Sequence, residues 1–73
     1  MARDICILLG ERIRELRKAR NWRQIDLAAE AELNVIYISD LEHGRKEVCL
    51  RTLQALAGAL DVKPSELLSS IGQ

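Results

Sequence analysis

Apolar residues recur every three or four positions along most of the chain, which is the spacing of amphipathic helices. No segment alternates between apolar and polar residues, so no strand is expected. The pattern predicts five helices, over about residues 4–20, 23–31, 34–43, 49–60 and from 64 onward. Their inward positions are Leu9, Ile13, Leu16, Leu27, Ala28, Ala31, Ile38, Leu41, Leu50, Leu53, Leu56, Ala57, Leu60 and Leu67. The predicted fold class is all-α, a compact bundle of five helices.

Residues that favour helix ends stand at these boundaries. Asp4 and Asn34 precede apolar runs, and their side chains can accept from backbone N–H groups of a first helical turn. Asn21 tolerates the left-handed conformation that ends many helices, and Gly44 suits the position after the third helix. Pro64 fits a first turn because no helical hydrogen bond needs its missing N–H. The end signals therefore agree with the hydrophobic period.

Length and composition limit the class of protein. The 73 residues allow one domain, 1–73, and 48% hydrophobic with 30% charged residues is an ordinary globular composition. The longest apolar run, Ile5 to Leu9, is too short for a bilayer, and there is no secretory signal. Cys6 and Cys49 cannot fill a zinc site by themselves. We expect a cytoplasmic protein without membrane contact or metal, and a core this small favours a homodimer.

The charges balance overall but are unevenly distributed. Eleven Lys and Arg residues match eleven Asp and Glu residues, so the net charge does not indicate a polyanionic partner. Between Arg12 and Arg23 there are six basic residues and one acid, whereas residues 30–42 hold four acids and no Lys or Arg. This asymmetry is typical either of a solvated helix face or of a surface that faces a polyanion.

Catalysis is poorly supported. His43 is the only histidine, no Ser or Cys stands in a nucleophile motif, and no glycine-rich phosphate loop is present. A core of Leu and Ala with two aromatic residues, Trp22 and Tyr37, leaves little room for a substrate cavity. We therefore expect no enzyme activity, no cofactor and no small-molecule ligand.

The two short helices around residues 24–41 carry the strongest signal. Two helices that cross steeply need a small residue at the crossing and a tight turn between them, and Ala28 suits the crossing. This is the pattern of a helix-turn-helix, whose second helix enters the major groove of DNA. Taken alone, the pattern also fits any hairpin of two helices.

A set of residues extends this pattern to most of the chain. It comprises Leu9-Gly10-Glu11-Arg12-Ile13-Arg14-Glu15-Leu16-Arg17, Gln24, Leu27-Ala28, Tyr37-Ile38-Ser39, Leu41-Glu42-His43-Gly44, Leu53, Ala57, Leu60 and Leu67. With these residues the chain resembles the XRE-type family of Cro and phage-repressor helix-turn-helix domains over about 9–68. The resemblance implies a five-helix, lambda-repressor-like DNA-binding domain. Its length, without an appended effector domain, also resembles the small controller proteins of restriction-modification systems.

The resemblance implies roles for individual residues. Arg17 and Glu42 match a buried structural ion pair. Base-reading positions fall at Asn34, Val35, Ile36, Ser39 and Asp40. The resemblance implies DNA-backbone contacts at Gln24, Tyr37, Arg45 and Lys46, of which Arg45 or Lys46 could also reach a base edge. To these we add Arg23, whose cation stands at the backbone-facing end of the second helix, and His43 beside Gly44.

Several residues depart from the family's pattern. Arg23 replaces a Ser or Thr N-cap, at a cost of about 0.5–2 kcal/mol, and Glu32 replaces a turn glycine, at a cost of roughly 1 kcal/mol if its backbone is left-handed. Val35 and Ile36 cannot read hydrogen-bonding groups, but they can pack on thymine methyl groups. They could instead be partly buried core residues. Asp40 could accept from a cytosine amino group.

We therefore expect a homodimeric, sequence-specific double-stranded DNA-binding protein that regulates transcription by occupying a palindromic operator. Leu68 and Ile71 exceed what the core needs and are the expected dimer contacts. The alternative is an antitoxin or a protein-interaction module on the same fold, which the zero net charge and the apolar residues Val35 and Ile36 would suit. The end of the chain two residues after Ile71 disfavours the antitoxin.

Overall fold

The structure is a computed structural model that describes residues 4–69, and over this range it contains five helices and no strand. The predicted all-α class is confirmed, the first four helices lie within a residue or two of their expected bounds, and the fifth begins at the expected residue. None of these helices is long and apolar enough to cross a membrane. The helices are α1 (Ile5–Ala19), α2 (Gln24–Ala31), α3 (Val35–Glu42), α4 (Leu50–Ala59) and α5 (Pro64–Leu68).

Local chemistry sets the helix ends as expected. The Asp4 carboxylate accepts from the Cys6 N–H at 2.7 Å, and the Asn34 side chain accepts from the Ile36 N–H at 2.7 Å. Asn21 (φ 58°) and Gly44 (φ 70°) adopt the left-handed conformation just after α1 and α3. These caps explain why the predicted boundaries agree closely with the observed ones.

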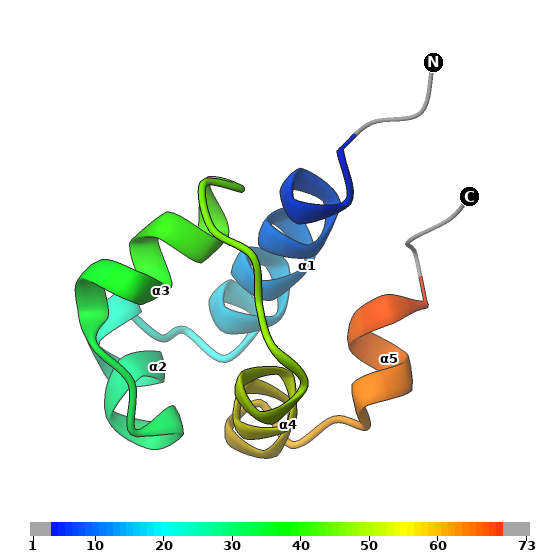
Figure 1. Ribbon diagram of the computed structural model, residues 1–73. Helices are drawn as coiled ribbons and strands as arrows, with labels where there is room; N and C mark the ends of the chain where they lie inside the picture. Colours follow the sequence, from blue (N-terminus) through cyan, green and yellow to red (C-terminus); the bar gives the residue numbers. More distant parts are fainter. Residues whose placement is uncertain (1–3, 70–73) are drawn as a thin grey trace.

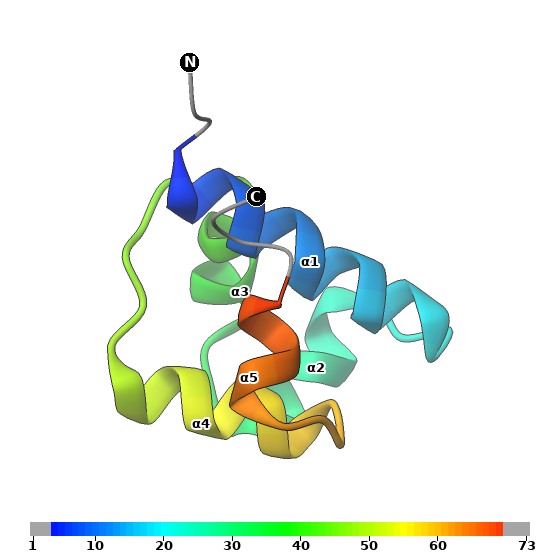
Figure 2. The same ribbon diagram turned by 90° about the vertical axis from the view of Figure 1, so that its right-hand side faces the viewer.

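The helices pack around one core. α1 lies against α3 and α5, while α2 packs on α3 and α4, as Figures 1 and 2 show from two sides. The α2–α3 pair thus occupies one side of α4, and α5 occupies the other (Figure 1). The buried apolar residues are Leu9, Ile13, Leu27, Ala28, Ala31, Ile38, Leu41, Leu53, Leu56, Ala57, Leu60 and Leu67.

Leu50 is a correction to the predicted core. Its spacing from Leu53 and Ala57 suggested the inward face of the helix, but the side chain is 83% exposed. Leu50 is the first residue of α4, and this first turn projects beyond α2 and α5, which cover the rest of the helix (Figure 2). Periodicity shows which face of a helix is apolar, but it does not show where the neighbouring helices end.

Gly10 is a buried position whose role the sequence pattern did not reveal. It lies in α1 where this helix meets the end of α3, and a Cβ added there would overlap the backbone carbonyl oxygens of Leu41 and Glu42. Only glycine therefore allows the two helices to approach this closely. The approach fixes the end of α3 against α1.

Candidate nucleic-acid interface

The α2–turn–α3 unit has the geometry of a helix-turn-helix. Ala28, buried in α2, faces the core that α2 shares with α3, and the Leu33 N–H donates to the Ala28 carbonyl at 2.8 Å across the turn. Glu32 ends α2 with a left-handed backbone (φ 56°, ψ 43°). Glu32 therefore has the left-handed backbone for which the sequence predicts a cost of roughly 1 kcal/mol, because an L side chain adopts this conformation less readily than glycine does.

The α3 helix has one buried face and one exposed face. Ile38, Leu41 and Glu42 are buried. Val35 is 36% exposed and Ile36 is 69% exposed. Ile36 is therefore not a core residue, and the alternative that assigned it to the core is wrong. An apolar side chain left in solvent at the start of this helix is available for an intermolecular contact.

Two further base-reading candidates on α3 are half-buried and engaged within the chain. The Ser39 carbonyl accepts a hydrogen bond from the Nδ1–H of His43 at 2.7 Å. The Asp40 carboxylate lies 3.5 Å from the Arg45 guanidinium, and the Arg45 N–H donates to the Asp40 carbonyl at 2.9 Å. The structure thus links a candidate base reader to a candidate backbone contact in the loop after α3.

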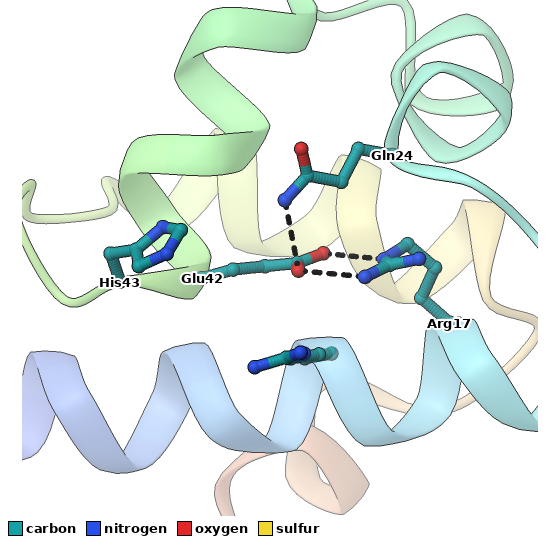
Figure 3. A pocket seen from close by; sticks show the side chains of 5 residues that line it. Arg17, Gln24, Glu42 and His43 are labelled. Atoms are coloured by element: carbon teal, nitrogen blue, oxygen red, sulfur yellow. Dashed lines mark hydrogen bonds and ion pairs between the residues drawn. The ribbon is translucent and has the colours of Figure 1, made fainter.

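Arg17 and Glu42 form the ion pair that the resemblance implies. The Arg17 Nε–H and Nη2–H groups donate to the two Glu42 carboxylate oxygens at 2.7 and 3.0 Å, and the two side chains are only 9% and 2% exposed. Arg17 also donates to the Trp22 carbonyl at 2.7 Å. Figure 3 shows the Glu42 carboxylate between Arg17 of α1 and Gln24 of α2, whose Nε2–H donates to it at 3.2 Å. The pair joins α1, α2 and α3.

Arg23 precedes α2 without a side-chain cap of the usual kind. Its backbone N–H donates to the Asp26 carboxylate at 2.8 Å, and its exposed guanidinium lies 3.2 Å from the same group. The hydrogen bonds between the two side chains are the main cause that lowers the pKa of Asp26 and raises the pKa of Arg23, and the backbone hydrogen bond lowers the pKa of Asp26 further. Asp26 therefore supplies part of the capping that Arg23 cannot, since a guanidinium has no acceptor.

Tyr37 of α3 contacts the loop that follows this helix, and Lys46 lies within that loop. The half-buried Tyr37 donates its hydroxyl to the Glu47 carbonyl at 3.4 Å. Lys46 is exposed, and no ion pair involves it within residues 4–69. Tyr37 thus supports the loop, and Lys46 is available to an external anion.

An apolar groove lies at the start of α1, the start of α4 and the end of α5, and Lys46 and Glu47 of the loop before α4 border it. It measures about 340 Å³. Leu68, an expected dimer contact, lines it and is partly exposed, whereas Ile71 lies outside the described residues. The lining residues are Ile5, Cys6, Leu9, Lys46, Glu47, Val48, Leu50, Leu53 and Leu68.

Sequence reasoning missed one residue near the candidate interface. Arg14 lines a polar cleft together with Arg17, Gln24, Glu42 and His43. On the sequence it was one of several basic residues on α1 that fit a solvated face equally well. The only available signal was its spacing of three residues from Arg17, which places both on neighbouring positions of one helix face.

Comparisons with known proteins agree with this geometry. The helix-turn-helix family model matches residues 13–67. The chain is 44% identical over 63 residues to the HTH-type transcriptional regulator DdrOP3 of Deinococcus deserti, covering 86% of this chain but 49% of that regulator. It is 38% identical over 69 residues to the control protein C.BamHI of Bacillus amyloliquefaciens, covering 93% of this chain and 85% of that protein.

A solved structure shows the same arrangement of helices. The restriction-modification controller protein C.AhdI from Aeromonas hydrophila superposes with a TM-score of 0.83 at 39% sequence identity, covering 85% of this chain and 94% of that chain. The family match spans the region in which α2 and α3 meet the Arg17–Glu42 pair. The chain belongs to the XRE-type helix-turn-helix family.

Proposed function

We propose that this chain is a sequence-specific, double-stranded DNA-binding regulator of transcription that acts as a homodimer on a palindromic operator. The observation that carries the proposal is the two-sided character of α3. One face of this helix packs on α1 and α2, and the other exposes Val35 and Ile36. Relatives named as a transcriptional regulator, control proteins and an immunity repressor support it. The role also fits the cytoplasmic location expected from the sequence.

Base reading would rest on few groups. Val35 and Ile36 would pack on thymine methyl groups. Asn34 uses its side-chain oxygen to cap α3, so its amide N–H groups remain as donors to a base edge. Ser39 and Asp40 complete the set, with Asp40 holding the Arg45 guanidinium near the same surface.

Contacts with the DNA backbone would fix the register of the helix. We assign them to Arg23, Gln24, Tyr37, His43, Arg45 and Lys46. Three of these side chains carry a full positive charge, and two copies would supply about six phosphate contacts, which gives a slope near −5 for log K against log salt concentration. A slope shallower than about −2 would contradict this assignment.

The apolar groove is the surface we assign to the dimer, with a second copy of this chain as its occupant. Leu50 and Leu68 present apolar area that no described helix covers. A twofold axis would place the same apolar patch of both copies face to face, so that Leu50 and Leu68 of one copy would bury those of the other. Ile71 remains a predicted contact.

Selection of bound duplexes from a random DNA library tests the function. We expect enrichment of a palindrome whose half-sites lie about one helical turn apart, because each recognition helix would enter one major groove. Recovery of no preferred sequence by the folded protein would overturn the proposal.

A matched pair of variants localises the reading to α3. Ile36→Ser should change the enriched sequence. Ile25→Ser alters an isoleucine that is also exposed but lies on α2, and it should leave the enriched sequence unchanged. An identical enriched sequence for both variants would remove Ile36 from the reading surface.

The second candidate is an antitoxin or protein-interaction module on the same fold. The observation in its favour is the exposed Ile36 in a chain of zero net charge. It predicts that duplex selection enriches nothing and that Ile36→Ser leaves the affinity for DNA unchanged.

A further inference from the structure

A small polar cleft opens where α1, α2 and α3 meet. It measures about 110 Å³, enough for several water molecules or one phosphate group. Its lining comes from Arg14 and Arg17 of α1, Gln24 of α2, Glu42 at the end of α3, and His43 just beyond it (Figure 3). Arg17 and Glu42 are buried and neutralise each other. The properties of the cleft toward a ligand therefore depend on Arg14, Gln24 and His43.

Arg14 gives the cleft an uncompensated positive charge. Its side chain is exposed, and no hydrogen bond or ion pair involves it within residues 4–69. Other arginines on α1 differ in this respect, because Arg12 pairs with Glu15 at 3.0 Å and Arg17 pairs with Glu42. An arginine without an acidic partner beside a cleft is suited to a phosphate, which its planar donors match.

Gln24 adds a directed neutral donor. One N–H of its amide donates to Glu42, which fixes the orientation of the group. An amide nitrogen carries two N–H groups, so the second remains for a ligand. Gln24 is thus held in position by the ion pair at the base of the same site.

His43 is a donor whose availability depends on protonation. Its Nδ1 lies 2.7 Å from the Ser39 carbonyl oxygen. A carbonyl can only accept, so Nδ1 carries the ring proton, and Nε2 of the neutral ring has no hydrogen to donate. Protonation places a hydrogen on Nε2 and a positive charge on the ring.

We propose that Arg14, Gln24 and His43 hold one DNA phosphate in this cleft, and that His43 donates to it only in its protonated form. The inference rests on the proposed function and adds Arg14 to the residues that contact the backbone. The charged groups that face His43 are Arg14 and Arg17 from α1 and Glu42 from α3, while α2 contributes the neutral Gln24. The cleft therefore carries one net positive charge with a neutral His43 and two with a protonated one.

Charge-matched variants test the role of Arg14. Arg14→Gln should weaken binding to the selected duplex about tenfold and make the slope of log K against log salt shallower by about 0.9 for each bound copy. Lys63→Gln also removes one positive charge, at the start of α5, which lies across α4 from the α2–α3 pair (Figure 1). It should change neither the affinity for the duplex nor the salt slope. Equal behaviour of the two variants would overturn the inference.

A scan with neutral methylphosphonates locates the phosphate. Replacing one phosphate at a time should reveal one position per half-site at which neutralisation weakens the parent but has no further effect on Arg14→Gln. If every position affects the two proteins equally, Arg14 does not contact a particular phosphate and the inference is wrong.

The pH dependence tests His43, the only histidine in the chain. Because the protonated form is the one that donates, the affinity for the duplex should rise, by up to about tenfold, as the pH is lowered. His43→Gln should abolish this rise. A flat profile for the parent would remove His43 from the site.

The result for the parent protein distinguishes failure of the proposed function from failure of the phosphate cleft. If the parent selects no duplex, the proposed function fails. If it selects a duplex but Arg14→Gln behaves like Lys63→Gln, only the phosphate cleft fails.

Discussion

The C-terminal half of α1 buries an arginine, whereas its first turn leaves an isoleucine in solvent. Arg17 lies with Glu42 and Gln24 at the junction with α2 and α3, and no buried side-chain nitrogen or oxygen within residues 4–69 lacks a partner. Ile5 is exposed, and it lines the apolar groove together with Leu50. One helix thus contains both kinds of exception to the rule that apolar residues are buried and charged residues are exposed.

The two ends of α1 indicate different roles, because a buried charge and an exposed apolar side chain are stabilised in different ways. A buried charge is tolerated only when it is paired and hydrogen-bonded, and the partners of Arg17 and Glu42 lie in this chain, so the polar junction indicates a structural role that fixes α3. An exposed apolar side chain has no partner within the described chain, so the groove indicates an intermolecular contact. Variants at the junction should therefore alter folding, and variants at the groove should alter association.

The largest expected effect is at the polar junction. Arg17→Ala leaves the Glu42 carboxylate buried without its main partner, which should lower the free energy of unfolding by about 3–5 kcal/mol. Arg51→Ala, at an exposed position of α4, should change it by less than about 0.5 kcal/mol. Urea unfolding at one fixed protein concentration measures both, since association affects stability. An unchanged midpoint for Arg17→Ala would contradict the structural role.

Helix bounds could be predicted because their causes are local. Asp4, Asn34, Asn21 and Gly44 each act on backbone groups within a few residues, so the sequence contains the whole signal. The Arg17–Glu42 pair joins residues 25 apart, and only the family resemblance implied it.

Features that depend on tertiary packing could not be predicted. The exposure of Leu50 follows from where α2 and α5 end, and the function of Gly10 follows from how closely α3 approaches. The engagement of Asp40 with Arg45 and the position of Arg14 in the cleft likewise need the relative placement of elements. No local pattern encodes these distances.

The second-largest expected effect is at the apolar groove. Leu50→Ser should weaken the dimer by about 3 kcal/mol, or roughly 100-fold, because two leucines would lose their burial. Ile25→Ser, at an exposed apolar position outside the groove, should leave association unchanged. Sedimentation equilibrium over a range of concentrations measures both. If the parent is already monomeric at high micromolar concentration, the groove is not a dimer surface.

A third test separates a crowded glycine from an open one. Gly10→Ala forces a Cβ onto backbone atoms of α3, so it should lower the free energy of unfolding by about 1–3 kcal/mol. Gly58→Ala, where nothing lies within 4 Å of the added Cβ, should raise it by about 0.5–1 kcal/mol because alanine favours the helix. Thermal unfolding of the two variants should therefore shift in opposite directions. Shifts of the same sign would mean that α1 and α3 can separate at Gly10 without loss.

The smallest effect concerns the exposed apolar residues of α3, for which the proposed partner is DNA. No Arg, Lys or Gln lies between Asn34 and Glu42, so the usual readers of guanine and adenine are missing from this helix. Replacing thymine with uracil in the selected duplex deletes only methyl groups, and it should cost about 1 kcal/mol at one or two positions per half-site. The same replacement should cost less in Ile36→Ser, because that variant has already lost one of the two apolar contacts while Val35 keeps the other. Indifference of the parent to uracil, with loss of binding in Asn34→Ala or Ser39→Ala, would show that polar groups of α3 read the operator instead.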